Sequence, residues 1–390
     1  MKNPLPIIVL AQFGCTSLWF AGNAILPDLA RTAQLPAGFL AHLTSAVQLG
    51  FIVGTLVFAL MAVADRFSPS RVFFVCALLA ALLNLGISAG GLSAGGLLSL
   101  RFGTGFLLAG IYPVGMKIAS DYYQRGLGVS LGFLVGALVL GTAFPHLLRS
   151  LTTTLPYRSV IYGTSLLAGL GGLAMLLLVP DGPYRQVRQS VPGGFLGRSS
   201  FFTGFRDNGF RSAALGYFGH MWELYAFWAF VPVMLAQFAR QHPSASLNVS
   251  LLSFLIIAGG SLGCVAGGYL SLQLGAKRVA LAALSLSGLC CLVSPFVLGG
   301  SSPALFIGFL VFWGIVVVAD SPLFSTLVAQ NAPAASRGTA LTLVNCIGFS
   351  LTIISIQLLN GLLVSVDASY LYMILVIGPA IGVAVLLKNR

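Results

Sequence analysis

Long uncharged apolar segments recur along the whole chain of 390 residues and constrain its fold more than any other feature. Each is long enough for an α-helix to cross the roughly 30 Å hydrocarbon core of a bilayer. Only 7% of the residues are charged, against roughly 25% in an ordinary soluble domain, so the chain has too little polar surface to face water. Backbone polar groups in lipid must be paired within a helix, and we therefore expect an all-α membrane protein. The twelve predicted transmembrane helices lie near residues 6–30, 38–63, 71–90, 96–119, 127–148, 157–179, 210–236, 247–272, 278–299, 303–328, 339–363 and 369–387.

The basic residues are distributed unevenly between the two ends of these helices. With the N-terminus on the inside, fifteen of the twenty Lys and Arg fall at or near inner ends. Basic residues are retained on the cytoplasmic side, so we expect a multi-pass protein of the cytoplasmic (inner) membrane with both termini cytoplasmic. The net charge of +12 comes from these scattered residues rather than from one basic patch, and we expect no nucleic-acid partner.

The longest hydrophilic stretch divides the chain into two halves. It predicts an N-terminal six-helix bundle at 1–179, a cytoplasmic linker at 180–209 and a C-terminal six-helix bundle at 210–390. The linker contains arginines with phenylalanines between them, a pattern that fits either a short amphipathic helix on the membrane surface or a plain solvated loop.

A weak internal repeat relates the two halves. The pair Phe13-Gly14 recurs as Phe218-Gly219, and Pro113 of the fourth segment corresponds to Pro322 of the tenth. Repeated helical halves are typical of secondary transporters, which place their substrate at mid-depth between the halves.

Two loops at matching positions of the halves carry a recognisable motif. Residues 65–71 read Asp-Arg-Phe-Ser-Pro-Ser-Arg, and residues 268–278 read Gly-Tyr-Leu-Ser-Leu-Gln-Leu-Gly-Ala-Lys-Arg. Both resemble the Gly-x-x-x-Asp-Arg-x-Gly-Arg/Lys signature of the major facilitator superfamily. The first copy has Met61 and Ser68 where the family has glycine, and the second has Leu272 in place of the aspartate.

The fourth segment adds the pattern Leu98-x-x-Arg101-x-x-x-Gly105-x-x-x-Ala109, which is similar to the motif in which this family places an intramembrane arginine. The resemblance covers essentially the whole chain. It implies two pseudo-symmetric six-helix bundles that rock against each other to expose a central site alternately to the two sides.

The resemblance also implies a conformational latch of charges at the cytoplasmic end, with Asp121 in reach of Arg66. A set of solvated loop charges is the alternative. The latch residues are Asp65, Arg66, Asp121 and Arg71.

Glycines spaced by four residues form a stripe in the fifth segment and another in the eighth. The drug-antiporter branch of the family carries a Gly-Pro signature in its fifth helix, which is missing here and places drug efflux in doubt. In the family these two helices meet between the halves, so we interpret the stripes as packing surfaces that allow close backbone approach. Their members are Gly128, Gly132 and Gly136, and Gly259, Gly263 and Gly267.

Three charged side chains lie within predicted transmembrane helices, namely Arg101, Glu223 and Asp320. A charge at the centre of a bilayer costs at least about 2.5 kcal/mol and marks a functional site by default. The resemblance places all three around the central cavity. Burial favours the neutral form of a carboxylate, which makes Glu223 and Asp320, with the nearby His220, candidate proton-coupling residues. The alternative is a fixed ion pair, for example Arg101 with Glu223. The candidate substrate-binding residues are Asn23, Trp19, Arg101, Trp222, Tyr225 and Trp228.

These features favour a secondary active transporter, and we expect a proton-coupled antiporter that exports a small organic solute, a metabolite or a drug. The alternative within this class is proton-coupled uptake or exchange of an organic anion held by Arg101. A non-transporting receptor and an intramembrane enzyme are the alternatives of another class; the dispersed histidines argue against the enzyme. No phosphate-binding loop is present. We expect no cofactor, no metal and no catalytic residue, with protons, membrane lipid and a small-molecule substrate as partners of a monomer.

Overall fold

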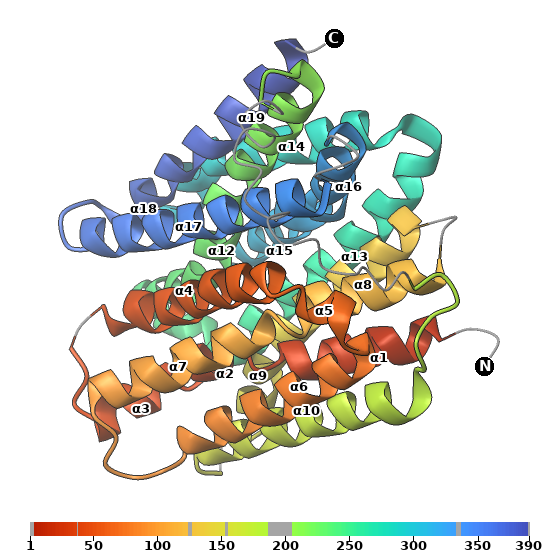
Figure 1. Ribbon diagram of the computed structural model, residues 1–390. Helices are drawn as coiled ribbons and strands as arrows, with labels where there is room; N and C mark the ends of the chain where they lie inside the picture. Colours follow the sequence, from red (N-terminus) through yellow and green to blue (C-terminus); the bar gives the residue numbers. More distant parts are fainter. Residues whose placement is uncertain are drawn as a thin grey trace. The chain divides into compact units, whose positions relative to one another are not determined.

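The computed structural model describes residues 4–36, 38–123, 127–152, 155–185, 205–332 and 337–388. Within these ranges the chain is helical and contains no strand (Figure 1). Eleven helical segments are long and apolar enough to cross a membrane, and a shorter apolar helix, Leu5–Thr16, begins a twelfth. The expected all-α membrane fold is confirmed, and the helices divide into two compact units.

The helices of the first unit run from red to yellow-green in Figure 1. In this unit α4 packs along α7, α6 packs along α10, and α1 contacts α9 and α10. The helices are α1 (Leu5–Thr16), α2 (Ala21–Ala24), α3 (Leu26–Thr32), α4 (Phe39–Leu60), α5 (Val63–Arg66), α6 (Pro69–Gly86), α7 (Ala94–Leu108), α8 (Tyr112–Tyr122), α9 (Leu127–Leu151) and α10 (Arg158–Leu178).

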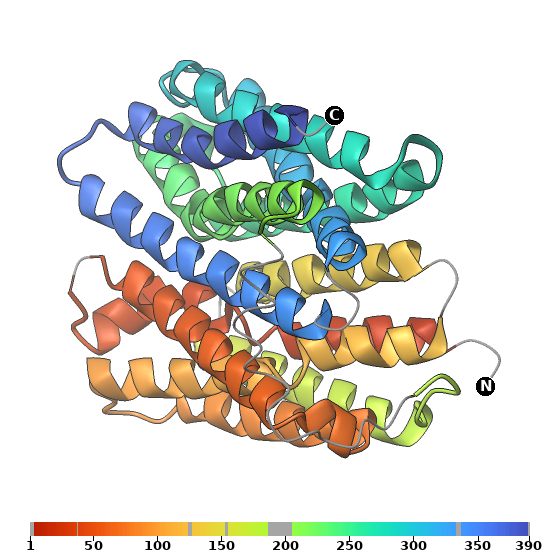
Figure 2. The same ribbon diagram turned by 45° about the horizontal axis from the view of Figure 1, so that its top comes forward.

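The helices of the second unit run from green to dark blue. The long helix α12, drawn in green in Figure 2, contacts α17 and α19, drawn in blue, and also packs against α13 and α16. The helices are α12 (Asn208–Gln241), η2 (Pro243–Ala245), α13 (Val249–Leu274), α14 (Ala276–Leu298), α15 (Pro303–Ala319), α16 (Ser321–Asn331), α17 (Arg337–Leu362), α18 (Ala368–Leu371), η4 (Tyr372–Val376) and α19 (Ile377–Lys388).

The fourth and tenth spans are each interrupted at the same place. Pro113 and Pro322 occupy the first turns of α8 and α16, directly after the interruptions. A proline has no N–H to donate and its ring clashes with the carbonyl four residues earlier, so the preceding helix ends there. Pro113 and Pro322 are 209 residues apart in the sequence, and the two structural breaks are related by the same offset.

The first span is also interrupted, whereas the sequence predicts one helix over 6–30. The helix α1 ends at Thr16 and α2 begins only at Ala21. The Thr16 hydroxyl donates to the carbonyl of Gln12 at 2.8 Å, and the Ser17 hydroxyl donates to the carbonyl of Gly14 at 2.7 Å. Such bonds back to the preceding turn compete with the helix and bend it.

Glycines set the spacing of the second and fourth spans, and equivalent glycines do the same for the eighth and tenth. A Cβ on Gly105 would overlap the carbonyl oxygen of Val47, and a Cβ on Gly314 would overlap that of Ile256. The offset is again 314 − 105 = 209 residues. The repeat thus preserves close backbone contact between corresponding helices.

The structure corrects the interpretation of the glycine stripe in the eighth span. Gly263 and Gly267 lie against the carbonyl oxygens of Ile315 and Ala319, so the stripe packs on α15 within the second unit. Gly128, from the other stripe, has no neighbour within 4 Å of an added Cβ. The stripe in the eighth span therefore serves packing inside one bundle.

Candidate functional site

Glu223 is a buried carboxylate surrounded by neutral hydrogen-bond donors. It lies near the middle of α12 and is 1% exposed. Its Oε1 accepts from Trp313 Nε1 at 2.7 Å and from Cys291 Sγ at 3.3 Å, while Oε2 accepts from Ser287 Oγ at 2.9 Å. The donors come from α14 and α15, and within the described residues no Lys or Arg forms an ion pair with Glu223. A charged carboxylate buried in this way is held by neutral dipoles alone.

One helical turn before Glu223, His220 faces a second buried carboxylate. His220 Nδ1 lies 2.9 Å from Asp320 Oδ1, and both side chains are at most 1% exposed. Asp320 is the residue between α15 and α16, so the proline-induced break brings it into the span at this depth. We call Glu223, His220 and Asp320 the acid cluster. Within the described residues no group of three His, Cys, Asp or Glu has the arrangement needed to hold a metal ion.

The aromatic residues predicted in the seventh span pack within the second unit. Trp222 donates from Nε1 to the carbonyl of Ile374 in η4 at 3.4 Å. The ring of Tyr225 lies 5.1 Å from that of Trp228 and 5.2 Å from that of Phe349. The contacts of Trp222 and Tyr225 join α12 to the last two spans, while the contact between Tyr225 and Trp228 lies within α12.

Arg101 is fully buried in α7 and is bonded to the interrupted first span. Its Nη1 donates to the carbonyl of Leu18 at 3.0 Å, and its Nη2 makes a short bond to the carbonyl of Trp19. Leu18 and Trp19 belong to the turn between α1 and α2, so the guanidinium caps the carbonyls of this interruption.

The other two residues predicted in the first span lie beside this contact. Asn23 Nδ2 donates to Thr44 Oγ1 at 2.8 Å, while its buried Oδ1 has no partner among the described residues. The ring of Trp19 lies 5.0 Å from that of Phe51. Both contacts attach the interrupted first span to α4.

Replacement of Arg101 by alanine should lower the stability of the protein in the absence of any solute. The carbonyls of Leu18 and Trp19 would lose the hydrogen bonds that Arg101 donates, and a buried carbonyl that loses its donor costs about 1–3 kcal/mol. We expect a clear fall in the melting temperature of Arg101→Ala, and no comparable change for Arg158→Ala, whose side chain is exposed. An unchanged melting temperature for Arg101→Ala would contradict the capping role.

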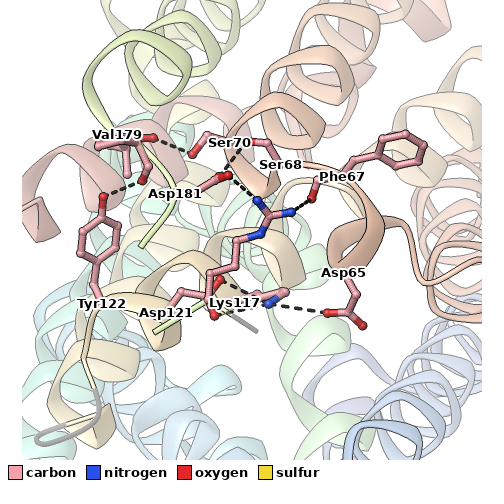
Figure 3. Close-up of polar contacts among 11 residues, drawn as sticks. Asp65, Phe67, Ser68, Ser70, Lys117, Asp121, Tyr122, Val179 and Asp181 are labelled. Atoms are coloured by element: carbon pink, nitrogen blue, oxygen red, sulfur yellow. Dashed lines mark hydrogen bonds and ion pairs between the residues drawn. The ribbon is translucent and has the colours of Figure 1, made fainter. Parts of the chain in front are cut away.

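One group of charged residues of the first unit lies where α5 and α8 end (Figure 3). Lys117 lies between two aspartates, with Nζ 3.6 Å from Asp65 Oδ1 and 3.2 Å from Asp121 Oδ2. The predicted partner of Asp121, Arg66, is not its partner here, since Lys117 stands four residues before Asp121 on the same helix and reaches it directly. Lys117 was not among the predicted latch residues, although this spacing is visible in the sequence.

The segment that follows α10 is fastened to the same end of the bundle. Arg185 forms an ion pair with Asp181 and donates to the carbonyl of Phe67 at 2.9 Å. Ser68 Oγ donates to Asp181 Oδ1 at 2.7 Å, and Tyr122 Oη donates to the carbonyl of Pro180 at 2.5 Å. These bonds connect the start of the predicted linker to the loop that carries the Asp-Arg motif.

Comparison with known proteins places this geometry among membrane transporters. A family model described as Major Facilitator Superfamily matches residues 8–356. The crystal structure of a mutant of the nucleoside transporter NupG superposes with a TM-score of 0.72 at 15% identity, covering 99% of each chain. The crystal structure of the human organic anion transporter MFSD10 (TETRAN) gives 0.72 at 16% identity, covering 98% of this chain and 100% of the other. No curated protein sequence matches.

Proposed function

Since the chain belongs to the major facilitator superfamily, we propose that this multi-pass membrane transporter exports a small organic solute in exchange for protons. It is a transporter and not an enzyme. The observation that carries the proposal is the acid cluster, in which Glu223 and Asp320 are buried without a Lys or Arg partner among the described residues. Intramembrane acidic and histidine side chains of this kind form the proton relays of pumps and transporters.

The hydrogen bonds of Ser287 support a proton-binding role for Glu223. The Ser287 hydroxyl lies 2.9 Å from Glu223 Oε2 and 3.1 Å from the carbonyl oxygen of Leu284, and it has one proton for the two acceptors. When Glu223 is charged, the hydroxyl donates to the carboxylate. When Glu223 is protonated, the carboxyl donates to Ser287, whose own proton turns to Leu284. The site thus satisfies both charge states of Glu223 without moving a helix.

The pair formed by His220 and Asp320 supports a second step in the same relay. The 2.9 Å between Nδ1 and Oδ1 is an ion-pair distance, and within the described residues neither Asp320 oxygen has a hydrogen-bond donor, so we propose that the imidazole turns slightly to pass a proton to the carboxylate. Because His220 and Glu223 are one turn apart on α12, a change of charge at one is felt at the other. We assign the proton-coupling role to these three residues.

The solute contacts that we propose lie on the interrupted first span, on α7 and on α12. They are Trp19, Asn23, Arg101, Trp222, Tyr225 and Trp228. The acid cluster and these aromatic rings suit a cationic or amphipathic solute. Exchange or uptake of an organic anion held by Arg101 is the second candidate, favoured by its buried Nε, which has no partner among the described residues. The solved neighbours include a nucleoside transporter and an organic anion transporter.

We further propose that the transporter works as a monomer in the cytoplasmic membrane, with both termini cytoplasmic and with alternating access by rocking of the two halves. The contacts of Lys117 with Asp65 and Asp121 support a latch at the cytoplasmic end of the first bundle. In this arrangement the latch holds the Asp-Arg loop against the inner half of the fourth span. Arg66 and Arg71 flank the latch.

Flux into proteoliposomes tests the exchange. Purified protein is offered uridine, tetraphenylphosphonium or p-aminohippurate under an inside-acid or an outside-acid pH gradient. Exchange predicts solute accumulation only when the interior is acidic, because protons leave as solute enters, and a protonophore should abolish it. Accumulation of p-aminohippurate under the outside-acid gradient would favour the anion-uptake alternative. Flux of a solute that ignores both gradients would contradict proton coupling.

A further inference from the structure

A cavity of about 550 Å³ opens in the first unit, beside the charged end shown in Figure 3. It lies between the loop that joins α4 to α6 and the segment that leaves α10. Its polar lining comes from three arginines, two serines and one aspartate, namely Arg66, Arg71, Arg185, Ser68, Ser70 and Asp181. The cavity is distinct from the acid cluster, which belongs to the second unit.

The charges around this cavity do not balance. Asp181 is its single acidic side chain and is already paired with Arg185. Neither Arg66 nor Arg71 forms an ion pair within the described residues, which include all eight Asp and Glu of the chain. Asp65, next to Arg66 in the sequence, is held by Lys117 instead. Three arginines against one aspartate leave a net charge of +2.

Donors around the cavity are also left over. Arg185 uses its terminal nitrogens on Asp181 and on the carbonyl of Phe67, while its buried Nε has no partner among the described residues. The helix α6 begins at Pro69. Ser68 at its N-cap makes no side-chain capping bond, and its hydroxyl donates to Asp181. Within the described residues, the first N–H groups of α6 therefore have no side-chain cap, and they lie beside the guanidinium groups of Arg66 and Arg71, which form no ion pair there.

We propose that this cavity binds a phosphate-bearing anion. Guanidinium groups bind phosphate oxygens in pairs of parallel hydrogen bonds, and an uncapped helix N-terminus adds N–H donors and positive potential. A volume of about 550 Å³ holds a group the size of a glycerophosphate headgroup. The cavity lies at the ends of helices long enough to cross a membrane, and basic pockets between the ends of such helices bind anionic headgroups. A soluble phosphate from the aqueous phase carries the same chemistry.

Binding of phosphatidylglycerol to the delipidated full-length protein, measured by native mass spectrometry, tests the proposal. Arg66→Gln/Arg71→Gln should weaken phosphatidylglycerol binding by at least about tenfold. The matched control is Lys277→Gln/Arg278→Gln, which removes two charges from the equivalent loop of the other half and should change the affinity by less than about twofold. Phosphatidylcholine, whose headgroup has no net charge, should bind more weakly than phosphatidylglycerol to the unaltered protein.

Titration calorimetry with inorganic phosphate in detergent distinguishes the two sources of the anion. Phosphate binding that is lost in Arg66→Gln/Arg71→Gln indicates a soluble ligand, and arginine-dependent binding of phosphatidylglycerol alone indicates a lipid. Arg66 and Arg71 are exposed, so the single variant Arg66→Gln and the double variant should both fold. The single variant should bind phosphatidylglycerol at least about threefold more weakly than the unaltered protein. Equal binding of both ligands by the double variant and the unaltered protein would overturn the proposal.

Discussion

Glu223→Gln should remove proton-driven transport while leaving the protein folded. Glutamine has the size of glutamate and can still accept from Trp313 and Cys291, but it cannot bind and release a proton at neutral pH. We expect pH-driven flux to fall by roughly a hundredfold, the lower end of what removal of a proton-transferring side chain costs. Exchange of labelled for unlabelled solute without a pH gradient should continue. Both rates are measured in proteoliposomes with the solute that moves in the flux experiment.

Asp207→Asn is the matched control for this variant. It also removes one carboxylate from α12, at the N-cap, where Asp207 accepts from the N–H of Phe210 at 2.8 Å. Asparagine caps helices as well as aspartate does, so pH-driven flux should stay within about twofold of the unaltered protein. Full pH-driven flux in Glu223→Gln would place the coupling proton elsewhere.

Gly105→Ala should destabilise the first unit strongly. Its new methyl group would overlap the backbone carbonyl of Val47, and a backbone atom cannot rotate away as a side chain can. Overpacking of a tight core costs typically about 1–3 kcal/mol, and we expect the upper end of this range or more. At about 2–4 °C per kcal/mol for a unit of this size, the melting temperature should fall by roughly 6–12 °C. Thermal denaturation in detergent measures the change.

Gly259→Ala provides the comparison. Gly259 in α13 corresponds to Gly50 in α4, at the same offset of 209 residues. The nearest atom to an added Cβ at Gly259 is a side-chain carbon of Ile315 at 3.5 Å, which is ordinary contact. This variant should be neutral or slightly stabilising, because alanine is the better helix former. Gly50→Ala should behave like Gly105→Ala, as its Cβ would overlap the carbonyl of Phe102. Equal stability of all three variants would rule out the packing argument.

The fold could be predicted from the sequence wherever its cause is local. Apolar length predicts the helices. Pro113 and Pro322 are visible in the sequence, but the fourth and tenth segments are each predicted as one helix, and a proline alone does not indicate a break because Pro145, Pro232 and Pro295 lie inside continuous helices. The break in the first span was missed. Its bent turn has a weak local signal in the hydroxyls of Thr16 and Ser17. The carbonyls of Leu18 and Trp19, however, accept hydrogen bonds from a side chain more than eighty residues away.

The candidate site could be predicted only in part. The cost of a charge in lipid marks Glu223 and Asp320 as unusual from their positions in apolar segments alone. Their surroundings depend on helix packing, so the sequence does not indicate that Trp313 and Ser287 donate to Glu223. Asp320 lies at the break between α15 and α16, two residues before Pro322. The proline does not indicate which helix Asp320 faces, so the pairing with His220 of α12 could not be predicted.

The burial of every cysteine has a practical consequence for following the transport cycle. All six cysteines lie among the described residues, none forms a disulfide, and each is at most 7% exposed. A membrane-impermeant maleimide needs an accessible thiolate, so the unaltered protein offers it little to react with. Single cysteines can therefore be introduced at chosen helix ends without first removing the natural ones, and spin or fluorescent labels attached to them would report how each bundle moves during turnover.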